Sequence, residues 1–124
     1  MAWDIRADRP VYLQLVEHLQ TAVVTGEYPP GSRIPPVREL AGQAGVNPNT
    51  MQRALAELER QGLVRSERTS GRYVTDDAAR IEAARRDQAE QILNDFFQRM
   101  AELGVGPAQA LRMAMQKKEM MHDD

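Results

Sequence analysis

Glycine and proline divide residues 26–74 into short segments, and this division restricts the chain to small helices and turns. Tyr28-Pro29-Pro30-Gly31 cannot continue a helix, because proline lacks the amide donor and fixes φ. Gly45 and then Asn47-Pro48 end one segment and start the next. Apolar residues between the breaks recur three and four positions apart, as on one face of a helix. The sequence therefore predicts short helices joined by a glycine-containing turn, the local pattern of a helix-turn-helix.

Three helices are expected in the first half of the chain. The first lies between Pro10 and Thr25, with Asp8 upstream as a candidate cap. The second begins at Pro36, whose fixed φ suits a first turn, and ends at Ala44. The third has an N-cap and first residue at Asn47-Pro48, ends near Gln61-Gly62, and buries one apolar side made by Met51, Ala54, Leu55 and Leu58.

A β-hairpin is expected directly after the third helix. Residues 63–66 and 72–75 have the composition of short strands, and the polar loop between them, residues 67–71, ends in Gly71. A hairpin of two strands is marginal alone, so Leu63 and Val74 should pack against the helices. The expected fold class is mainly α with this small hairpin as a wing.

A second helical pair is expected in residues 76–124. An apolar stripe runs from Asp77 to Leu103, Gly104-Val105-Gly106-Pro107 breaks it, and a last helix covers residues 107–119. The stripe is wider than one short helix can cover, so a second copy of the chain is the simplest cover. Phe96 and Phe97 could instead line a ligand pocket, but packing is the preferred reading. The residues assigned to dimerisation are Ile92, Leu93, Phe96, Phe97, Met100, Leu103, Leu111 and Met115.

The residue types argue against catalysis. The 124 residues include no cysteine, and the two histidines, His18 and His122, are far apart. His122 with Glu119, Asp123 and Asp124 resembles a metal cluster only superficially. No nucleophile and base pair, carboxylate pair or phosphate-binding glycine loop is present. We therefore expect no enzyme, no cofactor and no metal.

No segment is typical of export or membrane insertion. The amino terminus, MAWDIRADRP, lacks an apolar core of signal-peptide length, and no stretch approaches the roughly 20 apolar residues that span a bilayer. The expected location is the cytoplasm, without a membrane partner.

Charge is distributed unevenly along the chain. The net charge is −2, yet residues 33–75 hold seven basic and four acidic residues, a balance of +3. From Asp76 onward the balance is −3. The basic excess thus lies on the predicted helix-turn-helix and wing, as expected for a surface that binds duplex DNA.

The run GEYPPGSRIPPVRELAGQAGVNPNTMQRALAELERQGLV followed by SGRYV resembles the DNA-binding domain of the GntR family of bacterial transcriptional regulators. The short tail of two helices resembles the YtrA subfamily. The resemblance implies a DNA-binding domain at residues 1–75 and a dimerisation domain at 76–124, with a small-molecule effector as the family-based expectation. It also implies DNA contacts by Arg38 and the wing-tip Gly71. The familiar arginine at the start of the recognition helix is absent, because Asn47-Pro48 stands there.

Base readout should then depend on the exposed side of the third helix. Asn and Gln pair with adenine and Arg pairs with guanine, whereas Thr meets a phosphate or a thymine methyl group. The wing would add charge near the minor groove. Arg60 and Arg65 are better read as a solvated face, and so are Arg80, Arg85 and Arg86. The predicted DNA-binding residues are Arg38, Asn49, Thr50, Gln52, Arg53, Arg68, Gly71 and Arg72.

The resulting hypothesis is a homodimeric transcriptional repressor that binds a palindromic operator, because two recognition helices would meet two half-sites. A hinge near residues 75–79 would set their spacing. The alternative is a winged-helix module that binds proteins and does not read DNA.

Overall fold

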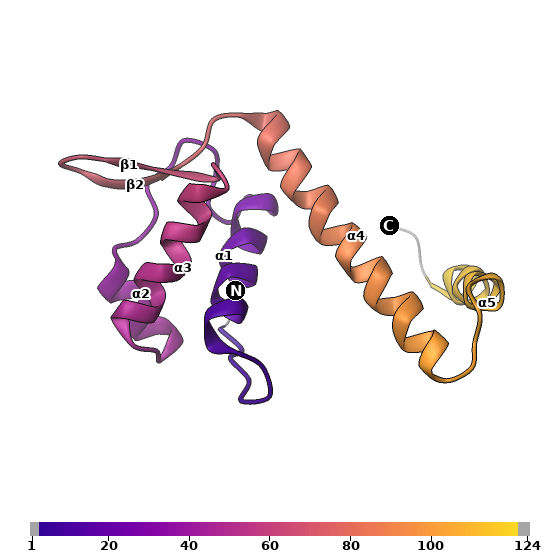
Figure 1. The fold of residues 1–124 in the computed structure, drawn as a ribbon. Coiled ribbons are helices and arrows are strands. Elements are labelled where there is room, and N and C mark those ends of the chain that lie inside the picture. The colour runs from indigo at the N-terminus through magenta and orange to yellow at the C-terminus, as the bar shows by residue number, and fades with distance from the viewer. Residues whose placement is uncertain (1–2, 122–124) are drawn as a thin grey trace. The chain divides into compact units, whose positions relative to one another are not determined.

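The computed structural model describes residues 3–121 of the chain (Figure 1). These residues divide into two compact units, with the boundary between Arg85 and Arg86. The expected fold class, mainly helical with one hairpin, is confirmed. In chain order the elements are α1 (Val11–Val24), α2 (Val37–Ala44), α3 (Pro48–Arg60), β1 (Val64–Glu67), β2 (Gly71–Val74), α4 (Ala78–Glu102) and α5 (Pro107–Met120).

The core of the first unit forms where α1, α2 and β1 each pack against α3. Its largest fully buried side chains come from the positions that the helical periodicity predicts, together with the residue before β1 and the last residue of β2. Leu63 and Val74 are both in this core, so the wing is anchored as expected. The side chains are Leu15, Leu19, Leu40, Met51, Leu55, Leu58, Leu63 and Val74.

The turn between α2 and α3 follows the residues that predicted it. Gly45 adopts the left-handed conformation with φ of 70° and closes α2. Asn47 is the N-cap of α3, and its side chain accepts a hydrogen bond from the Asn49 amide at 2.7 Å. Pro48 occupies the first helical position, where its missing amide costs nothing. The sequence therefore fixes where the exposed face of α3 begins.

Two predicted helix starts differ from the structure. Pro36 is the N-cap of α2 with an extended ψ of 157°, so the helix begins at Val37. Asp8 does not cap α1, because Pro10 holds the N-cap position without a side-chain bond and Asp8 is 3.4 Å from Arg6. The buried Gln14 organises this end of α1 instead: its amide binds the carbonyl oxygens of Arg6 and Arg9.

Each strand of the hairpin lies one residue nearer the tip than predicted. β1 and β2 pair antiparallel in the register Val64 to Val74 and Glu67 to Gly71, so Gly71 opens β2 and the loop is shorter. Leu63 precedes β1 because its amide bonds to the carbonyl oxygen of Leu58 at the end of α3. Residues 31–34 lie along the other side of β2 and form a single antiparallel bridge between Arg33 and Tyr73.

The first two turns of α4 belong to the first unit. Asp77 accepts a hydrogen bond from the Ala79 amide, and Asp77 in turn donates its amide to the Thr75 hydroxyl. Ile81 is buried in the core, and the Arg85 guanidinium donates to the carbonyl oxygen of Val24 at 2.6 Å. The segment expected as a hinge is thus held by hydrogen bonds at both its ends.

Candidate nucleic-acid interface

The solvent side of α3 is the centre of the candidate interface. Asn49, Gln52 and Arg53 are exposed, and we call these three residues the reading face. Thr50 is half-buried beside them. The opposite side of the same turns is in the core, so the helix cannot rotate without exposing Met51 and Leu55. The reading face is therefore held outward by the packing of α3.

Arg38 lies in the first turn of α2 and is exposed. In the part of the chain that the structure describes, no carboxylate pairs with its guanidinium. The N-cap residue before it, Pro36, makes no side-chain bond to the first turn. Amide donors at a helix start favour anions, so Arg38 and this turn together are suited to a phosphate.

Arg53 packs on the ring of Tyr12. The guanidinium carbon lies 4.6 Å from the ring centroid, which is within the range of a cation–π contact. Tyr12 belongs to α1, so this contact fixes Arg53 toward the α1 side of the reading face. Asn49 and Gln52 are exposed on the same helix.

Arg72 is held against α3 by an ion pair. Its Nε lies 3.0 Å from Glu59, and the side chains of Arg72 and Glu59 are 18% and 34% exposed. The Ser66 hydroxyl on β1 donates to the same carboxylate. Bonds from Ser66 and then Arg72 hold the pKa of Glu59 below its ordinary value, against the opposing effect of burial. Arg72 therefore joins the wing to α3, and its guanidinium is largely covered.

Two more arginines are neutralised by carboxylates. Arg60 binds Glu57 one turn away on α3, and its hydrogen bond is the main cause that lowers the pKa of Glu57 to about 2. Arg65 on β1 lies 3.1 Å from Glu67. Both guanidinium groups therefore already have a carboxylate partner.

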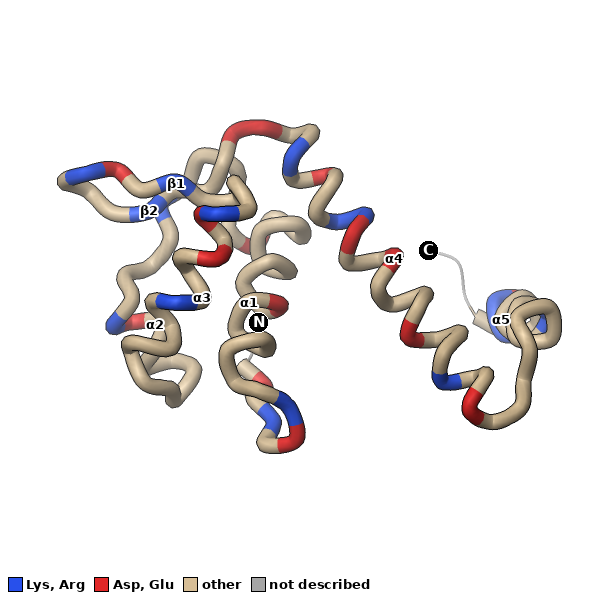
Figure 2. The backbone as a smooth tube through the Cα atoms, viewed as in Figure 1, with Lys and Arg blue, Asp and Glu red and all other residues tan. Residues whose placement is uncertain are grey.

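The remaining arginines of this unit's basic segment lie at the wing. Arg68 is exposed in the tip loop. Arg33, which the sequence prediction did not include, is exposed beside Gly71, where an added Cβ would be 2.9 Å from its Nε. Basic residues lie on α2, α3 and both strands of the hairpin (Figure 2). The only hint of Arg33 in the sequence is the apolar Ile34 next to it, because neighbours in an extended segment point to opposite faces.

The second unit buries little of its own apolar surface. Among its described residues only Ala110 is buried. Ile92, Leu93, Leu103, Leu111 and Met115 are exposed by 54–79%. Phe96, Phe97 and Met100 are half-buried, and the two phenyl rings meet edge to face at 5.1 Å.

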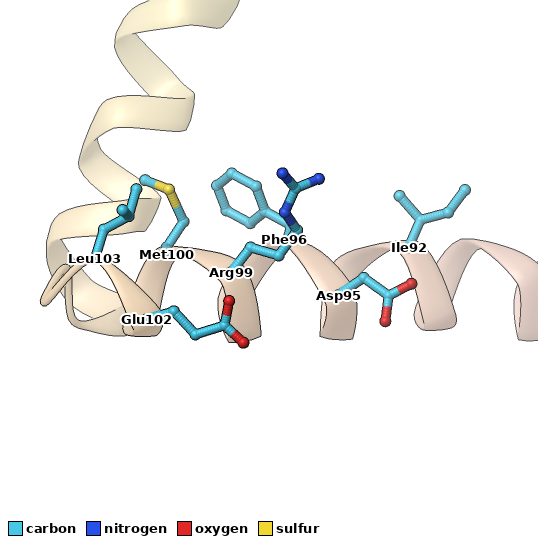
Figure 3. Close-up of a pocket in the computed structure, with 7 residues that line it drawn as sticks. All are labelled: Ile92, Asp95, Phe96, Arg99, Met100, Glu102 and Leu103. Atoms are coloured by element: carbon cyan, nitrogen blue, oxygen red, sulfur yellow. The ribbon is translucent and has the colours of Figure 1, made fainter. Parts of the chain in front are cut away.

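A groove of about 550 Å³ follows one side of α4 in this unit. Its apolar lining comes from Ile92, Phe96, Met100 and Leu103, which project to one side of the helix (Figure 3). Asp95, Arg99 and Glu102 complete the lining. Four of the residues assigned to dimerisation thus lie together on one side of α4, whereas Leu111 and Met115 lie on α5.

Among residues 3–121, no group of three histidine, cysteine or acidic residues could hold a metal ion. The cluster around His122 lies mostly outside the described residues. No helix in the described part of the chain has both the length and the hydrophobicity to cross a membrane.

Residues 11–74 match the profile of bacterial regulatory proteins of the gntR family. The HTH-type transcriptional regulator YhcF of Bacillus subtilis (strain 168) is 34% identical over 102 residues, covering 82% of this chain and 84% of YhcF. The HTH-type transcriptional repressor YtrA of the same organism is 37% identical over 75 residues, covering 60% of this chain and 58% of YtrA.

Two solved structures share this fold over different lengths of the chain. A GntR family transcriptional regulator from Listeria monocytogenes is 37% identical and superimposes with a TM-score of 0.81, covering 90% of this chain and 97% of that one. The DNA-binding domain of AraR, crystallised in complex with operator ORX1, is 33% identical with a TM-score of 0.52, covering 54% of this chain and 81% of that one.

Proposed function

The chain belongs to the GntR family of bacterial regulatory proteins and is a helix-turn-helix transcriptional regulator, and from this premise we propose that it is a homodimeric repressor of a palindromic operator. The observation that carries the proposal is the exposed reading face of α3, together with the exposed Arg38 in the first turn of α2. The relative YtrA is named a transcriptional repressor, which supports repression rather than activation. The AraR complexes with operator DNA support the partner.

In this proposal the first turns of α3 enter the major groove. Asn49 and Gln52 each pair with adenine, and Arg53 pairs with guanine, each good pair contributing about 1–3 kcal/mol of discrimination. Thr50 meets a phosphate or a thymine methyl group. Arg38 binds a phosphate or a base edge at the start of α2. Arg68 adds charge at the wing tip, where the contact depends on groove width.

Dimerisation is proposed for residues 76–124, and DNA reading for residues 1–75. The apolar residues of α4 and α5 are too exposed for a unit that folds without a partner, and a second copy would cover them. An isologous dimer presents two reading faces related by a two-fold axis, which requires a palindrome. A small molecule bound at the helical pair would change the arrangement of the two reading faces and so the affinity for the operator.

Selection of bound duplexes from a random library tests this function, because it reports binding, half-site sequence and spacing together. The selected duplex is then titrated by fluorescence anisotropy with the wild-type chain, Arg38→Ala and Arg60→Ala. We expect Arg38→Ala to weaken binding and Arg60→Ala, whose guanidinium is already paired with Glu57, to leave it nearly unchanged.

Two results would contradict the proposal. No binding of the wild-type chain to any duplex would favour the protein-binding module. A mass of one chain in light scattering, unchanged by Leu103→Glu, would exclude the dimer.

A further inference from the structure

The wing has fewer available positive charges than its sequence indicates. Arg72 is covered by its contact with Glu59, and Arg65 is paired with Glu67. Among residues 3–121, Arg33 and Arg68 have no carboxylate partner at the hairpin. A contact with the DNA backbone needs an accessible cation. Arg33 is therefore a candidate for this contact, although it lies outside the two strands of the hairpin.

Backbone hydrogen bonds fix the position of Arg33. The Val74 amide donates to the carbonyl oxygen of Ser32 at 2.9 Å, and the Ile34 amide donates to that of Arg72 at 3.0 Å. Arg33 lies between these two bonds, opposite Tyr73. Ile34 is only 4% exposed, so it anchors the segment in the core while Arg33 faces solvent.

The guanidinium of Arg33 lies over Gly71. Arg33 is opposite Tyr73, and Gly71 is two residues nearer the tip, so the side chain runs along β2 toward the tip. A Cβ at position 71 would be 2.9 Å from the Arg33 Nε and 3.3 Å from its Nη2. Gly71 also has φ of 115°, which other residues rarely adopt. Gly71 thus provides the room that places a free guanidinium beside the tip loop.

We propose that Arg33 is a DNA-backbone contact of the wing, in which its guanidinium, placed over Gly71, binds a phosphate, whereas Arg72 positions the wing through Glu59. This inference rests on the proposed function. The planar guanidinium has donors in a fork that matches two phosphate oxygens. The contact carries no sequence information, so it acts equally on every duplex.

The salt dependence of operator binding tests the contact. Each neutralised phosphate adds about 0.9 to the slope of log K against log salt. Arg33→Ala should therefore lower the slope by about 0.9 per subunit, so that wild type loses about 3.5-fold more affinity per subunit between about 0.05 and 0.2 M salt. Arg33→Lys keeps the charge and should keep the slope. Arg72→Ala should lower the thermal midpoint of unfolding and leave the slope unchanged.

A double-mutant cycle tests the role of Gly71. Gly71→Ala should weaken binding in the wild-type chain and weaken it less in an Arg33→Ala background, because the displaced guanidinium is then already absent. Equal losses in both backgrounds would show that Gly71 serves only the hairpin.

The outcomes separate this inference from the proposed function. An Arg33→Ala chain with the wild-type slope, beside an Arg38→Ala chain that loses affinity, overturns the inference and leaves the function standing. Failure of the wild-type chain to bind any duplex removes both.

Discussion

Replacing Glu59 with glutamine removes a charge that both strands of the wing contact. Ser66 on β1 and Arg72 on β2 donate to the same carboxylate of α3. Glutamine has nearly the same shape and keeps one acceptor oxygen, so the core is unchanged and only the charge is lost. The matched control is Glu67→Gln, the same substitution in the same hairpin, where Glu67 faces solvent and pairs with Arg65.

The exposure of the Glu59 and Arg72 side chains sets the expected loss in the free energy of unfolding. The side chains of Glu59 and Arg72 are 34% and 18% exposed, so water screens the pair only in part. Hydrogen bonds to charged groups contribute about 1.5–3 kcal/mol, and exposed pairs about 0–1 kcal/mol. We expect Glu59→Gln to lower the free energy of unfolding by about 1 kcal/mol, or about 4–8 °C in Tm. Glu67→Gln, with both partners nearly half exposed, should cost at most about 0.5 kcal/mol.

Thermal unfolding followed by circular dichroism measures both variants as a function of pH. The pKa of Glu59 lies below its ordinary value of 4.5 in the folded state, so its stabilising contribution is complete above pH 4.5. That contribution is lost as the pH falls through the lowered folded pKa. The difference between wild type and Glu59→Gln should shrink over that window. Equal midpoints for the two variants at neutral pH, or a difference that persists in acid, would refute the reasoning.

Three further substitutions test other contacts. Leu58→Ala should cost about 2–5 kcal/mol in denaturant unfolding, because Leu58 is fully buried, whereas Leu13→Ala, at a residue 46% exposed, should cost no more than about 1 kcal/mol. Tyr12→Leu should lower the free energy of unfolding by about 0.5–1 kcal/mol relative to Tyr12→Phe, which keeps the ring under Arg53. In an Arg53→Ala background the same two substitutions should not differ by this amount, because the cation–π contact is already absent. Burial lowers the pKa of His18 from 6.5, so stability should fall as the pH drops below 6.5, and His18→Gln should lower that dependence; an unchanged dependence would contradict it.

Local patterns in the sequence predicted the elements because those elements are determined locally. Asn47-Pro48 caps and starts α3 through contacts within three residues, and glycine closes α2 through its own φ. Helical spacing predicted which side of α3 is buried. The boundaries of the hairpin moved by one residue, since the Leu63 amide bonds back to α3 and so delays β1.

Partners between distant residues were not predictable in the same way. Arg72 and Glu59 lie on different elements, and so do Arg53 and Tyr12. Periodicity shows which face a side chain occupies but not which opposite charge or ring it meets there. Arg33 was missed for a related reason: its segment forms only one bridge with β2, too short to have a strand pattern.

The first turns of α4 pack on the core of one unit, and the same unbroken helix continues into the next. An α-helix turns by about 100° and advances by about 1.5 Å with each residue. One residue inserted after Arg85 would therefore rotate Ile92 and Phe96 about the helix axis while the side chains of the reading face stayed in place. In the proposed dimer, the length of α4 would therefore set the rotation between the reading face and the apolar residues of α4, so that two chains with identical reading faces would differ in the operator spacing that they accept.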